Sequence, residues 1–186
     1  MILSGAIIAA IVYYWNDVEA LEKFGYPGVF VLGVLGGATI LAPVPVTPIV
    51  FIMGGVARPD FAPYLGPLFI GLAAGAGETV GAALVYATGF AGGIFLPSPT
   101  SRHYDVYSHI TKWMEKREGI ILFVLSVVIN PFFYPAAIFA GAIHFGFKKY
   151  IIICFIGKVI KDMAVAFAGY YGLKWLFQLL GLTPPG

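Results

Sequence analysis

The sequence Leu41-Ala42-Pro43-Val44-Pro45-Val46-Thr47-Pro48 interrupts an uncharged apolar run that spans residues 24–57. A single helix of that length would be about 50 Å long at roughly 1.5 Å per residue, against a hydrocarbon core of about 30 Å. Each proline also lacks an amide donor and clashes with the preceding helical turn. We therefore expect the chain to turn at residues 43–48, between a rising limb at 25–41 and a returning limb at 49–57.

A second break, Asn130-Pro131-Phe132-Phe133-Tyr134-Pro135, interrupts the uncharged run of residues 119–147. Backbone groups freed in lipid cost several kcal/mol each unless the break is buried in protein or lines a wet cavity. Two interrupted segments at corresponding places in two halves of a chain indicate a transport site near the middle of the membrane. The residues expected to line it are Pro43, Pro45, Thr47, Pro48, Asn130, Pro131, Tyr134 and Pro135.

The composition is that of an integral membrane protein. Hydrophobic residues make up 60% of the chain and charged residues 11%, compared with about 25% charged residues in soluble domains. The net charge of +2, without any block of basic residues, argues against a nucleic-acid partner. No hydrolase, phosphate-loop or metal-ligand spacing occurs, so we expect neither an enzyme nor a cofactor or metal site.

The expected fold is an all-α membrane protein with two re-entrant helical hairpins and transmembrane helices in an inverted repeat. Residues 1–186 form one polytopic domain, with a first repeat at 25–96 and a second at 119–172. Residues 61–95 and 150–171 are the expected complete spans. Residues 97–118 are interpreted as an interfacial amphipathic helix, with a solvated connector as the alternative.

Spacing supports the repeat, because four residues of each half recur at matching separations. The correspondence pairs Pro48 and Gly54 with Pro135 and Gly141, and Glu78 and Gly89 with Lys161 and Gly172. The side that contains residues 97–118 and 148–149 carries most of the loop cations, which places it in the cytoplasm. The two halves then have opposite orientations, in what we expect to be the plasma membrane of a prokaryote.

Four charged residues fall within the predicted spans. Glu78 needs a partner in the membrane interior, either as a relay for protons or cationic groups or as part of a structural ion pair. Lys158, Lys161 and Asp162 form a second group. One interpretation is that Lys161 and Asp162 neutralise each other, and the other assigns Lys158 or Lys161 to Glu78 or to a lipid phosphate.

The order of several motifs resembles the DedA superfamily, also called the VTT-domain or SNARE-associated family. The similarity covers roughly residues 25–175 and rests on Pro43-Val44-Pro45-Val46-Thr47-Pro48, Met53-Gly54-Gly55, Gly75-Ala76-Gly77-Glu78-Thr79-Val80-Gly81, Tyr86, Gly89, Asn130-Pro131-Phe132-Phe133, Ala140-Gly141 and Gly157-Lys158. Thr47 stands where many members have an acidic residue, and Asn130 and Tyr134 stand near the second break, where many have arginines.

The resemblance implies two re-entrant hairpins that face each other and a lipid-translocating activity. The implied substrates are polyprenyl phosphate or phospholipids, and Glu78 occupies the family's acidic position in the first span. Membrane lipids are the expected partners, protons are a candidate coupling ion, and a homo-oligomer is compatible with the sequence. A non-transporting membrane scaffold or assembly factor and a small-solute exporter are the alternatives. A carrier should place Glu78 and a lysine of the last span in a cavity near both breaks, whereas a scaffold should pair them in a dry interface.

Overall fold

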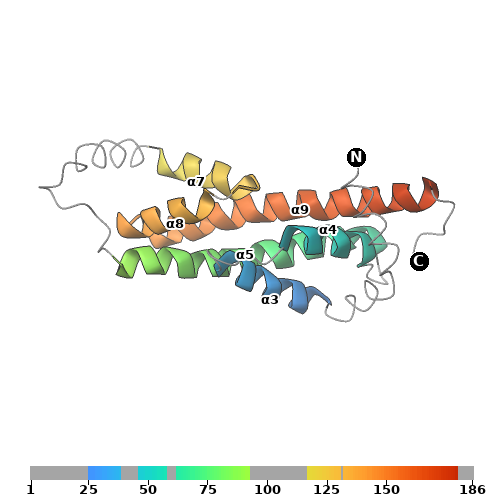
Figure 1. Ribbon diagram of the computed structural model, residues 1–186, viewed down its shortest axis with the longest axis horizontal. Helices are drawn as coiled ribbons and strands as arrows, with labels where there is room; N and C mark the ends of the chain where they lie inside the picture. Colours follow the sequence, from blue (N-terminus) through green and yellow to red (C-terminus); the bar gives the residue numbers. More distant parts are fainter. Residues whose placement is uncertain (1–24, 39–45, 58–61, 93–116, 131, 180–186) are drawn as a thin grey trace, which may run out of the picture.

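A computed structural model describes residues 25–38, 46–57, 62–92, 117–130 and 132–179, and every element in these ranges is helical. Figure 1 shows two long helices, α5 (Gly66–Ala91) and α9 (Phe147–Leu179), running along an elongated bundle. Four shorter helices pack beside them, together with a 3-10 turn, η1 (Pro63–Leu65). The shorter helices are α3 (Gly25–Ala38), α4 (Val46–Val56), α7 (Glu118–Val127) and α8 (Phe133–Ala142).

The long helices correspond to the two predicted spans. Helix α5 has 26 residues and starts after η1 with Pro67 in its first turn, where no amide donor is needed. It is the one helix in the described ranges that is both long and apolar enough to cross a membrane. Helix α9 has 33 residues and continues beyond the predicted 150–171 at both ends. Its middle carries the charged residues Lys158, Lys161 and Asp162.

The second helix of each short pair begins earlier than predicted. Helix α4 begins at Val46 and helix α8 at Phe133, so Thr47, Pro48, Tyr134 and Pro135 lie in first helical turns rather than in the turns of the chain. A proline is tolerated there because the first four amides of a helix have no intrahelical acceptor. The predicted break residues Pro43, Pro45 and Pro131 lie outside the described residues, as do residues 1–24 and most of the predicted interfacial helix.

Glycines bring the helices into backbone contact, as the small residues on the predicted face of α5 indicated. A Cβ atom on Gly71 would lie 2.6 Å from the Cα of Met163, and one on Gly75 would lie 2.7 Å from the Cα of Val159. On a neighbouring face, a Cβ on Gly81 would lie 2.5 Å from the backbone amide nitrogen of Ala38. Helix α5 is therefore held tightly between α9 and α3.

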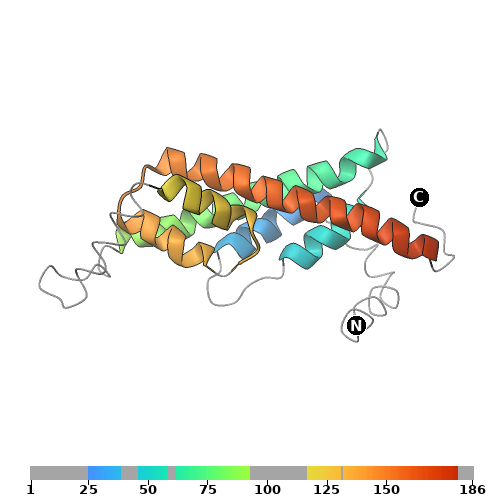
Figure 2. The same cartoon turned by 90° about the horizontal axis from the view of Figure 1, so that it is seen from above.

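Helices α4 and α8 each pack on the long helix that lies farther away in the sequence. Helix α4 packs on α9, where a Cβ on Gly54 would overlap the carbonyl oxygen of Ala166. Helix α8 packs on α5, where a Cβ on Gly141 would overlap the carbonyl oxygen of Tyr86. Figures 1 and 2 show α7 and α8 beside one half of the long helices and α3 and α4 beside the other half.

The buried apolar residues form two clusters, one in each half of the bundle. The first contains Ala82 and Val85 of α5 with Cys154 of α9, and the second contains Ala74 of α5 with Ala166 of α9. Glu78 on α5 and the group Lys158, Lys161 and Asp162 on α9 lie between these clusters. The fold therefore places the polar centre of the chain midway along the bundle.

Candidate functional site

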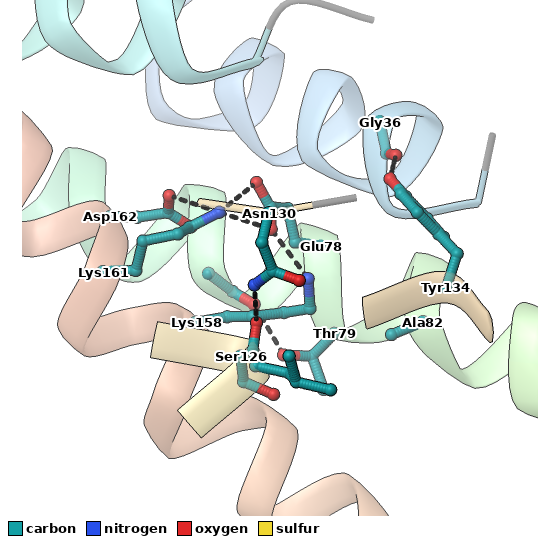
Figure 3. A network of polar contacts seen from close by, with 12 residues as sticks. Gly36, Glu78, Thr79, Ala82, Ser126, Asn130, Tyr134, Lys158, Lys161 and Asp162 are labelled. Atoms are coloured by element: carbon teal, nitrogen blue, oxygen red, sulfur yellow. Dashed lines mark hydrogen bonds and ion pairs between the residues drawn. The ribbon is translucent and has the colours of Figure 1, made fainter. Parts of the chain in front are cut away.

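The centre of the bundle is a cluster of four charged side chains from α5 and α9 (Figure 3). Glu78 accepts a hydrogen bond from Lys158 Nζ at 2.8 Å through Oε2 and is bonded by Lys161 Nζ at 2.8 Å through both oxygens. Glu78 is 6% exposed and Lys158 5% exposed. A buried carboxylate without cations would be very costly, so the two lysines account for its presence here.

Asp162 is the least satisfied member of the cluster. Its side chain is fully buried, and Lys161 Nζ lies 3.2 Å from its Oδ1. The geometry of that contact is not that of a hydrogen bond, and among the described residues neither carboxylate oxygen of Asp162 has a hydrogen-bond donor. Lys161 therefore contacts both carboxylates but directs its hydrogen bonds to Glu78. Both interpretations of the lysines apply in part, because they pair with Glu78 while Lys161 also contacts Asp162.

Phe133 places an aromatic ring against the Lys158 ammonium. The Nζ atom lies 4.1 Å from the ring centroid, within the range of a cation–π interaction. Phe133 is the first residue of α8 and is buried, so the start of this helix contributes directly to the charged centre. Phe133 is not among the predicted site residues, although it lies within the second sequence break.

Asn130 satisfies backbone groups at the end of α7. Its Nδ2 donates to the carbonyl oxygens of Leu125 at 3.0 Å and Val128 at 2.7 Å, and its Oδ1 accepts from the Phe132 amide at 2.9 Å. Three main-chain groups near the break thus gain partners from one side chain. Such pairing is what irregular backbone needs where water is scarce.

Tyr134 connects the two helical pairs across the centre. Its hydroxyl group donates to the carbonyl oxygen of Gly36, near the end of α3, at 2.6 Å (Figure 3). This is a link between the second residue of α8 and a residue 98 positions earlier in the chain. Figure 3 shows the Tyr134 side chain pointing away from Lys158 and toward α3.

A cavity of about 200 Å³ lies against the charged cluster. Its lining comes from both long helices and from the ends of all four short helices. Its rim includes Val128 and Ile129, which are 53% and 64% exposed, and the exposed Pro48. The polar and charged lining residues are Thr47, Glu78, Ser126, Asn130, Tyr134, Lys158 and Lys161.

Most of the predicted site residues in the described ranges meet in this place. Thr47, Pro48, Asn130 and Tyr134 line the cavity with Glu78 and the two lysines, whereas Asp162 lies beside the lining residues. Pro135 is not among the lining residues. Gly36, Ser126 and Phe133 also line the cavity and were not predicted. Of these three, only Phe133 has a signal in the sequence, because it lies between the two prolines of the second break.

The cluster offers two ammonium donors and two carboxylate acceptors, and no sulfur or imidazole ligand. Within the described part of the chain, no three side chains of His, Cys, Asp or Glu gather where they could hold a metal ion. The first turn of α4 also faces the cavity through Val46 and Thr47. Free amides at a helix N-terminus favour an anion. The lysines of the cluster offer hydrogen-bond donors suited to an anion, and the carboxylates offer acceptors suited to a cation.

Comparison with known proteins gives one family. No curated protein and no solved structure matches the chain. The VTT domain family matches residues 44–171, a range that includes α4, α5, α7, α8 and all four charged residues of the cluster. The chain therefore belongs to the VTT-domain family, the family of DedA and SNARE-associated membrane proteins.

Proposed function

We propose that this protein is a lipid carrier that moves the headgroup of a polyprenyl phosphate or a phospholipid across the bilayer. The observation that carries the proposal is the charged cavity at the point where both sequence breaks meet, midway along the bundle. Membrane lipid is the substrate and protons are the candidate coupling ion. The protein performs no covalent chemistry on the lipid.

The two pairs of short helices are re-entrant hairpins in this proposal. Helices α3 and α4 have 14 and 11 residues, and α7 and α8 have 10 each. At about 1.5 Å per residue none of them exceeds about 21 Å, so none crosses a core of about 30 Å alone. In Figure 1 the pair α3–α4 lies beside one half of the long helices, short of the C-terminal end of α9, and the pair α7–α8 lies beside the other half.

An inverted repeat explains why contacts recur between the halves. Gly77 approaches Phe30 as Gly157 approaches Phe123, and Gly89 approaches Ile138 as Gly169 approaches Phe51. These contacts relate α5 to α9 by 80 residues (77 to 157, 89 to 169). The correspondence pairs Glu78 with Lys158, whereas the spacing in the sequence pairs it with Lys161.

The cluster binds a headgroup by exchanging partners. A phosphate prefers the same ammonium donors as a carboxylate, so an arriving phosphate can compete with Glu78 for Lys158 and Lys161. The start of α4 adds a favourable field for the anion. A Glu78 carboxylate released from its lysines in a buried site is costly and is neutralised by taking up a proton. The exposed apolar rim at Val128 and Ile129 faces the acyl chains.

The two halves have opposite orientations in the membrane. Residues 97–118 and 148–149 carry the larger share of the loop cations and lie on the cytoplasmic side. We place the protein in the plasma membrane of a prokaryote as one polytopic domain of residues 1–186. A homo-oligomer is compatible with this arrangement.

A membrane scaffold is the second candidate, because Glu78 ties α5 to α9 through both lysines. A purely structural ion pair would give the same distances. The two functions differ in what happens when the pair is weakened. A scaffold loses stability alone, whereas a carrier also loses lipid movement while still folded.

The deciding experiment is a labelled-lipid flip assay in proteoliposomes with a fluorescent phospholipid and a fluorescent polyprenyl phosphate. We expect Lys158→Gln and Glu78→Gln each to lower the flip rate at least about tenfold. Lys149→Gln, an exposed lysine of the same helix, is the matched control and should keep the wild-type rate. Thermal unfolding in detergent is measured for each variant.

Equal flip rates for wild type and Lys158→Gln would reject the carrier. So would a wild-type rate no higher than that of protein-free liposomes. Loss of stability in the variants without loss of flipping among the folded molecules would favour the scaffold.

A further inference from the structure

The charged cavity reaches two junctions where a short helix of one pair ends near the start of a short helix of the other pair. The α4–α7 junction lies along α9 and consists of residues 46–48 and 128–130. The α3–α8 junction lies along α5 and consists of Gly36 with Phe133 and Tyr134. Both sets of residues line the same cavity.

The two junctions occupy corresponding places in the two halves. Thr47 is the second residue of α4, and Tyr134 is the second residue of α8. Each of these residues is followed seven positions later by a glycine that contacts a long helix. Gly54 meets Ala166 of α9, and Gly141 meets Tyr86 of α5. Thr47 and Tyr134 are therefore equivalent positions on either side of the charged cluster.

The α3–α8 junction is closed among the described residues. The Tyr134 hydroxyl reaches across it and donates to the Gly36 carbonyl at 2.6 Å. Gly36 is buried and Tyr134 is half-buried, so the ring lies between the helices (Figure 3). Its phenol oxygen is the group that completes the contact between the ends of α3 and α8.

The α4–α7 junction is open in the part of the chain that the structure describes. Its rim residues Val128 and Ile129 are more than half exposed, and Pro48 is exposed as well. Thr47 lines the cavity at the position that Tyr134 occupies on the other side. The threonine side chain is several atoms shorter than tyrosine, so it does not span the corresponding gap.

We propose that Thr47 and Tyr134 determine through which of the two junctions the charged cavity is reached. A headgroup approaches past Thr47 at the α4–α7 junction, and Tyr134 holds the α3–α8 junction shut until its bond to Gly36 breaks. As a step in lipid transport this inference rests on the proposed function. Which junction gives access to the cavity can, however, be measured without any lipid.

The first test measures access to the cavity with a thiol reagent. The reporter is Ser126→Cys, a lining position, in a Cys154→Ala background that removes the native thiol. The protein is purified in detergent, and labelling by a small methanethiosulfonate is followed by mass spectrometry. We expect Thr47→Tyr to slow labelling at least about tenfold, because a tyrosine there closes the open junction.

Exchanging the side chains of residues 47 and 134 is the more decisive test. In Thr47→Tyr/Tyr134→Thr the open and closed junctions exchange places, so labelling should return to within about threefold of the reporter background. Thr47→Tyr/Tyr134→Phe keeps the ring and lacks the hydroxyl group, and it should fall between the single variant and the swap. It also serves as the second variant if removal of the ring impairs folding.

Labelling of Thr47→Tyr at the background rate would overturn the inference. So would a double variant that stays as slow as Thr47→Tyr although it shows the same thermal unfolding. The flip assay on these proteins separates the two proposals. If the wild-type protein does not transport lipid, the proposed function is rejected. The order of the labelling rates among the variants then still decides which junction gives access to the cavity. Active wild type with equally active Thr47→Tyr rejects the access proposal alone.

Discussion

The two halves of the bundle share their packing and differ in their polar residues. Helix α8 lies on α5 through Gly141 and Gly89 in the way that α4 lies on α9 through Gly54 and Gly169. At the centre, however, Glu78 on α5 faces Lys158 on α9. Matching backbones thus present opposite charges to each other.

A second difference lies one turn further along the long helices. In the 80-residue relation that pairs Gly77 with Gly157, Ala82 of α5 is the equivalent of Asp162 of α9. Ala82 is buried and offers its carbonyl oxygen to the Tyr150 hydroxyl at 3.0 Å. Asp162 is equally buried, but its carboxylate has no hydrogen-bond donor among the described residues. The comparison indicates that glycine contacts set the architecture, while a few side chains make the two halves chemically different.

The largest effect is expected when the acidic side of this comparison is removed. Glu78→Gln leaves Lys158 and Lys161 buried without their shared carboxylate, and breaking a buried pair in this way costs about 3–5 kcal/mol. Lys158→Gln leaves Glu78 bonded to Lys161 and should cost less than half as much. Equilibrium unfolding in mixed micelles gives both values.

The order of the two losses is the critical result. A loss in Lys158→Gln as large as that in Glu78→Gln would mean that the pair, and not the carboxylate with its two lysines, is the unit of stability.

A smaller effect is expected where the halves are alike. Gly54→Ala and Gly141→Ala each push a methyl group into the backbone of a long helix, and we expect losses of about 1–3 kcal/mol of similar size. Gly172→Ala is the control, since its Cβ would lie 3.5 Å from the Phe51 ring. That change should be neutral or stabilise by up to about 1 kcal/mol, because alanine favours the helix.

Thermal unfolding of the three glycine variants measures this match. Tolerance of Gly141→Ala together with strong destabilisation by Gly54→Ala would show that the two interfaces are not equivalent.

Much of the charged site midway along the bundle could be predicted from the sequence, because prolines and a carboxylate within an apolar run are unfavourable in lipid. Prolines inside apolar runs must end a helix, and a lone Glu78 in a span must have a partner. Helix starts were less predictable, because Pro48 and Pro135 are compatible with a first turn as well as with a break. The partners of Lys161 depend on how α5 crosses α9, and local spacing does not contain that information.

Contacts between distant residues were the least accessible to sequence analysis. The ring of Phe133 beneath Lys158 and the bond from Tyr134 to Gly36 each require the register of two helices that pack through backbone contacts. The shift from Lys161 to Lys158 as the counterpart of Glu78 has the same origin. Glycines recur every few residues on α5, and α9 carries three, so spacing alone allows more than one alignment.

The smallest effect is expected at Asp162, and its sign is informative. Asp162→Asn keeps the shape of the side chain and removes a buried charge that has no hydrogen-bond donor, while Lys161 retains its 2.8 Å bonds to Glu78. Because an unsatisfied buried group is costly, we expect the free energy of unfolding to rise by up to about 1 kcal/mol. Equilibrium unfolding beside wild type measures the change, and Gln178→Asn at an exposed position of α9 controls for surface effects. A loss above about 2 kcal/mol would instead mean that the second carboxylate is required to balance the two lysines. The cluster would then be a four-charge unit, and the difference between Ala82 and Asp162 would be one that the fold depends on.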